Sequence, residues 1–371
     1  MGLKILSDHK IAFFVSGLRP GGIGRYVLNL AEGFVKKGLK VDIILPKEIE
    51  AYHHFIPGEV NIINLQTNRT LKSFFPLIRY LKKEKPFALI SANDYVNVTA
   101  ITACKIAGVK TKMVSTIHTD RSNADNNNLF KEYLFKIIAR RVYPLSNNIV
   151  AVSKGVSENA VKIYNLPQYL VKVIYNPILD DRLFEKMNER VNHKWFRGGN
   201  YKIILGVGRL MKEKDFPSLI KAYKIVRERR PAKLVLLGEG VERNYLQKII
   251  VENDLEADVD LPGFVDNPYS YMKKADLLVL SSKYEGLPTV LVESMAVGTP
   301  VVSTDCPSGP SEILENGKYG ILVPVGNVAL MAEAIENALD EPVDSEALRL
   351  RAMDFSIDKI TEKYASLINL V

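Results

Sequence analysis

The chain has 371 residues, of which 47% are hydrophobic and 25% charged, and its formal net charge is +8 at pH 7. This length predicts two domains, and the composition excludes a disordered or fibrous chain. The positive charge favours an anionic partner, whether a nucleotide, a nucleic acid or an anionic membrane surface.

The two cysteines, Cys104 and Cys306, form no CxxC pair. Their spacing argues against a disulfide scaffold or a cysteine zinc site and is typical of a reducing compartment. The segment MGLKILSDHK carries charge where a signal peptide needs an apolar core, and no apolar run reaches the ~20 residues that span a bilayer. We therefore expect a cytoplasmic protein without a transmembrane helix.

Short apolar segments alternate with longer amphipathic ones in the first half of the chain. The short segments predict β-strands at residues 10–16, 40–46, 87–93, 111–118 and 147–153. Helices are predicted between them, the first over residues 24–38, where Gly38 is suited to end it. Repeated strand–helix units with apolar strands predict a parallel sheet covered on both faces.

The same pattern restarts after an irregular junction at residues 174–199. Further strands are predicted at residues 201–210, 232–240, 257–265, 275–282, 298–305 and 319–326. We predict an α/β fold of two doubly wound, Rossmann-like domains, residues 1–178 and 179–355, followed by a C-terminal helix at 356–371. Because open α/β sheets bind ligands beyond the carboxyl ends of their strands, site residues are expected just after strands, facing a central cleft.

A glycine-rich turn follows the first strand. Gly21, Gly22 and Gly24 lead directly into a helix. Glycines let the backbone approach a phosphate, and a helix N-terminus offers free N–H groups and partial positive charge. The string matches neither the dinucleotide fingerprint nor a P-loop, so a phosphate loop and a tight strand–helix turn both remain open.

Charged side chains follow two further strands. Arg209 and Lys214 come after the first strand of the second domain, where they could grip a phosphate or form a solvated basic loop. His118 ends the strand at 111–118. Its position favours a site residue, although a lone histidine is often only structural.

The stretch EGLPTVLVE combines a loop with the start of a buried helix. Glu285 lies at the carboxyl edge of the sheet, Pro288 suits the first helical position, and Glu293 falls inside the helix. A carboxylate can accept two hydroxyl hydrogen bonds from a diol, and the helix N-terminus can hold a diphosphate. This geometry suits a nucleotide-sugar.

Together these motifs resemble the GT-B glycosyltransferases, specifically the retaining family 4. The resemblance rests on Gly21-Gly22-Ile23-Gly24, His118, Gly208-Arg209 with Lys214, and the Glu285-x7-Glu293 pair, in the right order along nearly the whole chain. It implies that the C-terminal helix returns to the N-terminal domain. It also implies a bacterial enzyme that assembles glycans or glycolipids from nucleotide-sugars.

The resemblance assigns roles to individual residues. It implies that His118, Arg209, Lys214 and Glu285 are catalytic. Glu285 would hold the transferred sugar, Glu293 the ribose, and the residues from Gly263 the base. The implied donor contacts are Gly21, Gly22, Gly24, Arg209, Lys214, Gly263, Phe264, Val265, Glu285, Gly286, Leu287, Pro288, Thr289, Val290 and Glu293. No cofactor or metal is expected, since the family needs none and cationic side chains can do a metal's electrostatic work.

No second carboxylate stands out as a nucleophile for double displacement, which favours front-face attack with retention. The turn Ser308-Gly309-Pro310-Ser311 resembles family members that act on undecaprenyl diphosphate or lipopolysaccharide, often with UDP-galactose or UDP-N-acetylhexosamines. It could close on the donor sugar or simply start a helix.

Two predicted helices of the first domain, residues 68–85 and 129–143, are basic and amphipathic. Such helices can lie on an anionic membrane or contact a lipid diphosphate, but ordinary surface helices share the pattern. We expect an enzyme peripheral to the cytoplasmic face of the inner membrane, with a glycan or lipid-linked acceptor.

Two other functions fit parts of the pattern. A UDP-sugar 2-epimerase has the same architecture, but the Glu285/Glu293 spacing and the Arg209/Lys214 pair favour transfer. A non-catalytic nucleic-acid-binding protein should interleave aromatic and basic residues on one surface, whereas here the basic residues cluster on helices with aliphatic faces. We therefore expect no nucleic-acid partner.

Overall fold

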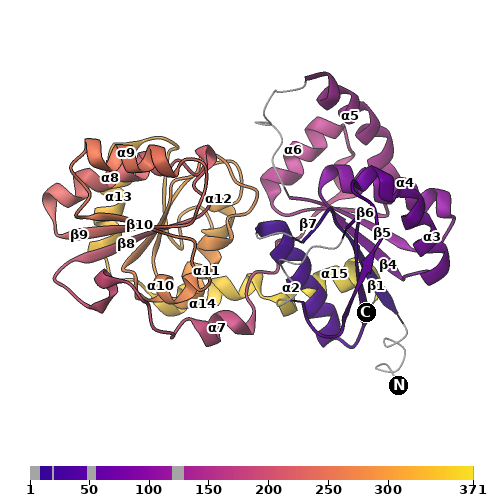
Figure 1. Ribbon diagram of the computed structural model, residues 1–371, viewed down its shortest axis with the longest axis horizontal. Coiled ribbons are helices and arrows are strands. Elements are labelled where there is room, and N and C mark those ends of the chain that lie inside the picture. The colour runs from indigo at the N-terminus through magenta and orange to yellow at the C-terminus, as the bar shows by residue number, and fades with distance from the viewer. Residues whose placement is uncertain (1–8, 19–20, 48–55, 119–128, 371) are drawn as a thin grey trace. The chain divides into compact units, whose positions relative to one another are not determined.

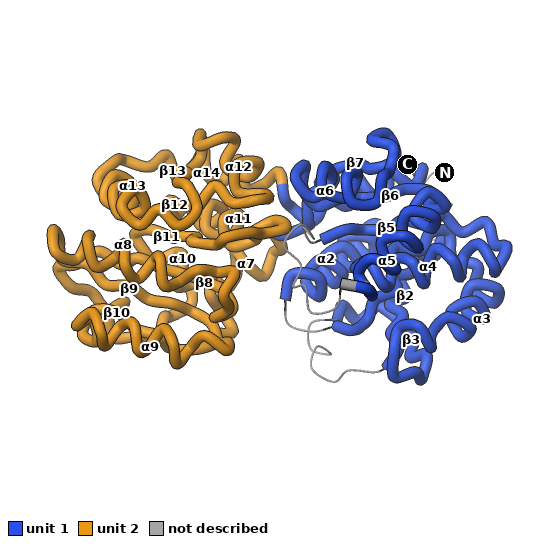
Figure 2. The backbone as a smooth tube through the Cα atoms, turned by 90° about the horizontal axis from the view of Figure 1, so that it is seen from above, with its two compact units in different colours: residues 1–178, 355–371 blue, residues 179–354 orange. Residues whose placement is uncertain are grey.

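The computed structural model (Figure 1) describes residues 9–18, 21–47, 56–118 and 129–370, without the side chains of Leu129 and Lys131. Its backbone divides into two compact units (Figure 2). Unit 1 comprises Met1–Ile178 and Phe355–Val371, and unit 2 comprises Leu179–Asp354. The C-terminal part of unit 1 therefore begins at Phe355, one residue before the predicted start of the C-terminal segment at 356. The predicted last helical residue, 371, lies outside the described residues.

Unit 1 is built on a seven-stranded parallel sheet in the order β3-β2-β1-β4-β5-β6-β7. Its strands are β1 (Lys10–Phe14), β2 (Lys40–Leu45), β3 (Val60–Asn64), β4 (Ala88–Ala92), β5 (Lys112–Ile117), β6 (Asn148–Ala151) and β7 (Val171–Val173). Two of them, β3 and β7, were not predicted. Both lie at sheet edges and are half exposed, so they lack the continuous apolar run that marks the central strands.

The helices of unit 1 follow the strands along the chain. They are α2 (Gly22–Lys36), α3 (Phe74–Glu84), α4 (Asp94–Ala107), α5 (Leu129–Val142), α6 (Lys154–Tyr164) and α15 (Ile357–Leu367). Short 3₁₀ turns occur at η2 (Thr70–Ser73), η3 (Tyr143–Leu145) and η4 (Gln168–Leu170). The predicted helix at 68–85 is thus η2 followed by α3.

The C-terminal helix α15 packs beside α2 in unit 1, as the yellow helix in Figure 1 shows. Ile360 and Tyr364 on α15, and Ile368 just after it, are fully buried in the core cluster to which α2 and β1 also contribute. The approach is close: a Cβ on Gly33 would lie only 2.0 Å from Thr361 Oγ1. Only glycine allows the two helices to pack here, and the predicted return of the C-terminal helix is confirmed.

Unit 2 is built on a six-stranded parallel sheet in the order β10-β9-β8-β11-β12-β13. Its strands are β8 (Lys202–Val207), β9 (Ala232–Leu237), β10 (Val259–Gly263), β11 (Leu277–Leu280), β12 (Val301–Thr304) and β13 (Ile321–Val323). Its α-helices are α7 (Asp181–Lys186), α8 (Phe216–Arg229), α9 (Arg243–Glu252), α10 (Pro268–Lys274), α11 (Thr289–Val297), α12 (Pro310–Ile313), α13 (Val328–Asp340) and α14 (Ser345–Ala352). Three 3₁₀ turns, η5 (Lys194–Arg197), η6 (Lys212–Lys214) and η7 (Met353–Phe355), complete the unit and its junction with α15.

The junction at 174–199 is more ordered than its polar sequence predicts. It contains α7 and η5, and it buries Val191 and Trp195. His193 Nε2 lies 2.8 Å from Asp260 Oδ2, which ties the junction to β10.

Both sheets share one topology, which determines where a ligand can bind. In each, the first strand in chain order lies between the second and the fourth: β1 between β2 and β4, β8 between β9 and β11. The helices leave to opposite sides at these switch points, so the loops after the two neighbouring strands diverge and leave room for a ligand. The two doubly wound Rossmann-like domains are therefore confirmed, and the loops after β8 and β11 become the first place to look for a site.

Candidate functional site

Two loops meet at the switch point of unit 2, one after β8 and one after β11. Ser281 Oγ donates to the backbone carbonyl of Lys214 at 2.7 Å, and the Lys283 amide donates to the carbonyl of Glu213 at 2.8 Å. The two segments that sequence reasoning selected independently are thus held side by side by hydrogen bonds.

The side chains of Lys214 and Glu285 form an ion pair between these loops. Lys214 Nζ lies 2.5 Å from Glu285 Oε1, and the side chains are only 17% and 13% exposed. Ser282 Oγ also donates to Glu285 Oε1, at 2.6 Å. A pair so shielded from water interacts more strongly than a surface ion pair, and it holds both groups in defined positions.

The backbone of Glu285 is locked by the turn that follows β12. Its amide donates to the carbonyl of Pro307 at 2.8 Å, and the Ser308 amide donates to the carbonyl of Glu285 at 2.9 Å. Gly309 has φ 102°, and a Cβ there would lie 2.7 Å from Pro288 Cδ. The turn at 308–311 therefore packs against the Glu285 loop and fixes its backbone, and it also begins the short helix α12.

Helix α11 begins directly after this loop. Pro288 is its N-cap rather than its first residue, with ψ 98°, and Thr289 is the first helical residue. No side chain caps the helix and no acidic residue lies in its first turn, so neither of these groups neutralises the partial positive charge of its N-terminus. Glu293 lies in the second turn and is 2% exposed. The predicted order of loop carboxylate, helix N-terminus and helical carboxylate is present, with Pro288 corrected by one position.

Arg209 stands at the outer side of the same switch point. Its side chain is 72% exposed and lies 3.5 Å from Glu213 Oε1. Such an exposed pair is worth only about 0–1 kcal/mol, so little holds the guanidinium in place. Lys214 is fixed and shielded, whereas Arg209 is free to turn toward an anion.

The predicted base-binding segment lies on the same edge of the sheet, two strands from β8. Gly263 ends β10 with φ 94°, and its carbonyl accepts the Gly238 amide at 2.9 Å. Phe264 is 68% exposed and Val265 half-buried. An exposed aromatic side chain beside the carboxyl ends of β9 and β10 offers a face on which a base can stack.

In unit 1 the helix that follows the glycine turn contacts His118. Gly21 precedes α2 with φ 144°, while Gly22 and Gly24 lie in its first turn. One turn further, Tyr26 packs edge-on against His118, with ring centroids 4.4 Å apart. Thr116 Oγ1 lies 2.8 Å from His118 Nε2, and burial lowers the pKa of His118 to about 3. The residue at 20, also part of the predicted turn, lies outside the described residues.

Sequence reasoning missed several residues at these loops. Ser281 and Ser282 were treated as the end of a strand, and Thr116 as an ordinary strand residue. Asn93 was also missed: it follows β4 at the switch point of unit 1 and has φ 88° and ψ 140°, a conformation that non-glycine residues rarely adopt. The only signal for all four was their place at the carboxyl end of a strand.

No group of three or more metal-ligating side chains occurs among the described residues. Both cysteines are free and buried, and burial raises the pKa of each thiol to about 12. Neither is therefore a nucleophile at neutral pH.

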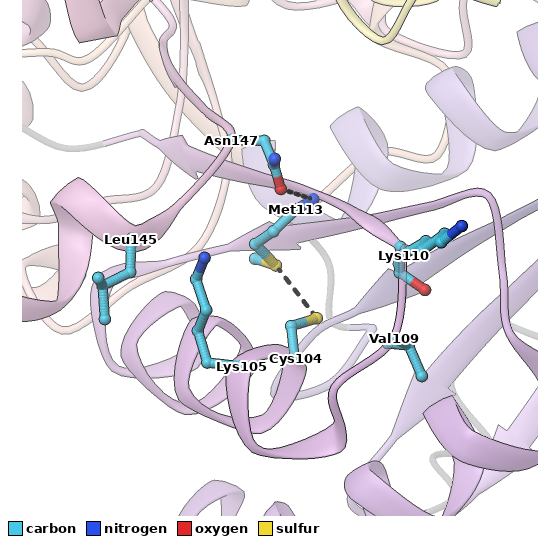
Figure 3. Close-up of a pocket in the computed structure, with 8 residues that line it drawn as sticks. Cys104, Lys105, Val109, Lys110, Met113, Leu145 and Asn147 are labelled. Atoms are coloured by element: carbon cyan, nitrogen blue, oxygen red, sulfur yellow. Dashed lines mark hydrogen bonds between the residues drawn. The ribbon is translucent and has the colours of Figure 1, made fainter.

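One small pocket, of about 140 Å³, lies in unit 1 (Figure 3). Its lining includes Cys104, Lys105 and Met113, and Cys104 Sγ lies 3.9 Å from Met113 Sδ. The pocket is at the amino end of β5, whereas His118 follows the carboxyl end. It is therefore not part of the candidate site.

None of the helices in the described part of the chain is long and apolar enough to cross a membrane.

Comparison with known proteins agrees with this geometry. Residues 20–182 match the family described as Glycosyltransferase Family 4, and residues 188–353 match the family described as Glycosyl transferases group 1. The chain is 31% identical to N-acetylgalactosamine-N,N'-diacetylbacillosaminyl-diphospho-undecaprenol 4-alpha-N-acetylgalactosaminyltransferase of Campylobacter jejuni, over 92% of this chain and 93% of that protein.

Two further similarities extend over nearly the whole chain. An undecaprenol-linked-glycan alpha-1,4-N-acetyl-D-galactosaminyltransferase of Campylobacter jejuni is 28% identical, with 97% of this chain and 98% of that protein covered. The structure of Anabaena HepE in complex with UDP has the same fold, with a TM-score of 0.78 and 20% identity over 98% of this chain and 100% of that one. The predicted family and fold are therefore confirmed: the protein belongs to the group 1 glycosyltransferases and is a glycosyltransferase of the GT-B type.

Proposed function

We propose that the protein transfers an N-acetylhexosamine or a hexose from a UDP-sugar to a hydroxyl of a glycan linked to a lipid diphosphate. One observation carries the donor site: Lys214 and Glu285 are paired at the switch point of unit 2, beside the uncapped N-terminus of α11. The cation and the helix N-terminus suit a diphosphate, and the carboxylate suits sugar hydroxyls.

In this proposal each charged group has a separate task. Arg209 and Lys214 neutralise the departing diphosphate, and the α11 amides of Thr289 and Val290 contact it. Glu285, with the amides of Gly286 and Leu287, holds the sugar. These interactions strengthen as charge develops on the leaving group, so they lower the barrier rather than only increasing donor affinity. No metal is required, because two cationic side chains and a helix N-terminus supply the positive charge.

The remaining assignments extend this scheme. Glu293 accepts hydrogen bonds from the ribose diol, and the segment Gly263-Phe264-Val265 receives the base. Gly21, Gly22 and Gly24 approach the diphosphate, and His118 contacts a sugar hydroxyl. Retention of configuration follows if the departing diphosphate oxygen takes the acceptor's proton on the same face of the sugar.

The choice of donor and acceptor draws on the relatives. The two Campylobacter jejuni enzymes named above are N-acetylgalactosaminyltransferases that act on undecaprenol-linked glycans. An amino sugar and a polyprenyl diphosphate acceptor are therefore the first substrates to test for this chain.

A donor screen tests the proposal. UDP-, GDP- and ADP-linked sugars are incubated with the protein, with and without an undecaprenyl-diphosphate glycan, and release of the nucleoside diphosphate is measured. We expect release from a UDP-sugar that rises at least about tenfold when acceptor is added. Binding or release with none of the donors contradicts the donor site, and a change of sugar without acceptor points to the epimerase instead.

We further propose that α5 docks on an anionic membrane. The structure distinguishes the two helices that sequence reasoning grouped together: on α3, Leu77, Ile78 and Leu81 are buried in unit 1, and Phe75 is the large apolar side chain that is exposed. On α5, by contrast, the side chains that are exposed at helical spacing are apolar: Phe130, Tyr133, Leu134 and Ile138.

This exposed stripe of α5 is flanked by positive charge. Arg140 and Arg141 are exposed in its last turn, and Lys136 is half-buried. An apolar stripe with cationic flanks suits insertion at the boundary between the lipid headgroups and acyl chains, with each cation adding about 1 kcal/mol near an anionic surface. Such docking would keep a lipid-linked acceptor close to unit 1.

The double variant Phe130→Ser/Leu134→Ser is expected to lose at least about tenfold in its affinity for vesicles with anionic lipid, because each lost apolar contact removes about 1–2 kcal/mol. Sedimentation with the vesicles measures the affinity. Its matched control is Leu350→Ser, which removes a side chain that is 64% exposed in unit 2. Donor turnover in solution should stay unchanged in both. Equal vesicle binding by the double variant and the wild type contradicts docking through α5.

A further inference from the structure

His118 is held from two directions in unit 1. Thr116 Oγ1 lies 2.8 Å from His118 Nε2, and the ring of Tyr26 packs edge-on against the imidazole at 4.4 Å between centroids. Tyr26 is itself anchored, since its hydroxyl is hydrogen-bonded to the hydroxyl of Tyr364 on α15 at 3.0 Å. Within the described part of the chain, no hydrogen bond engages the other ring nitrogen, Nδ1.

The hydrogen atoms of this cluster can be counted. Thr116 has a single hydroxyl hydrogen, and it donates that hydrogen to the backbone carbonyl of Ser91 at 2.9 Å. A carbonyl oxygen cannot donate, so the direction of this bond is fixed. With that hydrogen given to Ser91, Thr116 Oγ1 can only accept, both from the Tyr26 hydroxyl, which also bonds to it, and from His118, which requires a hydrogen on Nε2.

The surroundings of the ring also determine its charge. Thr116 is fully buried, Tyr26 is 2% exposed, and both are uncharged. His118 itself is half-buried, and loss of solvent around its ring lowers its pKa to about 3, so the ring carries one hydrogen at neutral pH rather than two. With that hydrogen on Nε2, the Nδ1 atom keeps its lone pair.

We propose that Thr116 holds His118 in the neutral Nε2–H tautomer, so that Nδ1 accepts a hydrogen bond from a sugar hydroxyl of the substrate. Thr116 is then a positioning residue, and His118 orients the substrate as an acceptor instead of acting as a proton donor or a cation. The hydrogen on Nε2 follows from the geometry of unit 1 and the neutral charge from the desolvation of the ring, whereas the sugar hydroxyl rests on the proposed function.

Nitrogen NMR on protein with ¹⁵N-labelled histidine rings tests the tautomer without any substrate. The chain has five histidines, and the signal that disappears in His118→Gln identifies the one in question. We expect a protonated Nε2 and an unprotonated Nδ1 in the wild type. A hydrogen on Nδ1, or a doubly protonated ring at neutral pH, overturns the proposal.

Variants of Thr116 test whether this residue selects the tautomer. Thr116→Val removes the acceptor oxygen and should give a mixture of tautomers, while Thr116→Ser should restore the wild-type signature. The matched control is Thr111→Val at the opposite end of β5, where the lost hydroxyl donates to the Pro86 carbonyl at 2.7 Å. A wild-type signature in folded Thr116→Val, or an equal change in Thr111→Val, contradicts the positioning role.

Two variants of His118 test the substrate contact. The amide of asparagine lies where Nδ1 lies in histidine, and the amide of glutamine lies where Nε2 lies. His118→Asn should therefore keep up to about tenfold more transfer activity than His118→Gln, the effect of one hydrogen bond. Equal activities, or the opposite order, overturn the acceptor role. If no sugar nucleotide is used even by the wild type, the proposed function fails, while the NMR result still decides the tautomer.

Discussion

Replacing Lys214 or Arg209 with alanine is expected to lower kcat by about 10²- to 10³-fold while weakening donor binding by less than about tenfold. Both cations are assigned to the diphosphate, whose negative charge increases as the bond to the sugar breaks. They therefore contribute more in the transition state than in the donor complex. Steady-state transfer gives kcat, and calorimetric titration with intact donor in the absence of acceptor gives Kd.

The two variants differ in what they do to the free protein. The Arg209 side chain is 72% exposed, and its ion pair with Glu213, at 3.5 Å, is therefore weak. Loss of Arg209 should leave the stability of the fold unchanged. Lys214 shields the Glu285 carboxylate, and its removal leaves Ser282 as the partner that the structure shows for that group. We expect Lys214→Ala to unfold at a lower temperature, by the loss of about 1–3 kcal/mol.

Lys283→Ala is the matched control for both. This lysine lies in the same loops and its side chain is 52% exposed, but it pairs with Asp215 at 3.5 Å and has no role in the proposed site. Its kcat should remain at the wild-type level. Equal losses of kcat and of donor affinity in the Lys214 and Arg209 variants would mean that these residues bind the donor without acting on the transition state.

The central strands and the motifs that follow them could be predicted from sequence because both depend on local patterns. A buried parallel strand needs a continuous apolar run, and β8 and β11 have one. The edge strands β3 and β7 could not be predicted, since each is partly exposed and has no continuous buried apolar run.

The contact between Lys214 and Glu285 could not be predicted from local sequence patterns either, but for a different reason. Their separation in sequence says nothing of distance; they meet because β8 and β11 are neighbours in the sheet. Strand order depends on the packing of the whole unit. The same holds for Tyr26 and His118, which α2 and β5 bring together.

The amphipathic pattern of the basic helices was also ambiguous. In α3 most of the apolar face is part of the core: Leu77 and Leu81 are fully buried, whereas Phe75 is 74% exposed. In α5 one apolar stripe is buried through Phe135 and Ala139, and a second one remains exposed. A sequence shows that a helix has apolar residues, but only the fold shows which of them have a partner.

The two glutamates that flank the start of α11 should separate sugar binding from nucleotide binding. Glu285→Gln is expected to lower the rate of sugar transfer by at least about 10²-fold and to weaken the binding of UDP-sugar. The Kd of free UDP should stay unchanged, since UDP contains no transferred sugar. Glu293→Gln is expected to weaken the binding of UDP and of UDP-sugar equally, by about 10- to 100-fold, since both ligands contain the ribose diol.

Glutamine is the right replacement at both positions because it preserves the shape of the side chain while it removes the charge and one of the two acceptor oxygens. At position 285 its amide oxygen can still accept from Ser282, and at position 293, which is 2% exposed, it creates no cavity. Thermal unfolding of each variant checks that the fold is intact, and calorimetry with UDP and with UDP-sugar measures the two affinities. The assignment of sugar and ribose to these two carboxylates is wrong if Glu285→Gln weakens the binding of free UDP as much as that of UDP-sugar. It is also wrong if Glu293→Gln leaves the affinity for UDP unchanged. If instead each variant affects only its own ligand group, Glu285 contacts the sugar and Glu293 the nucleoside, as expected when the diphosphate lies between them at the α11 N-terminus.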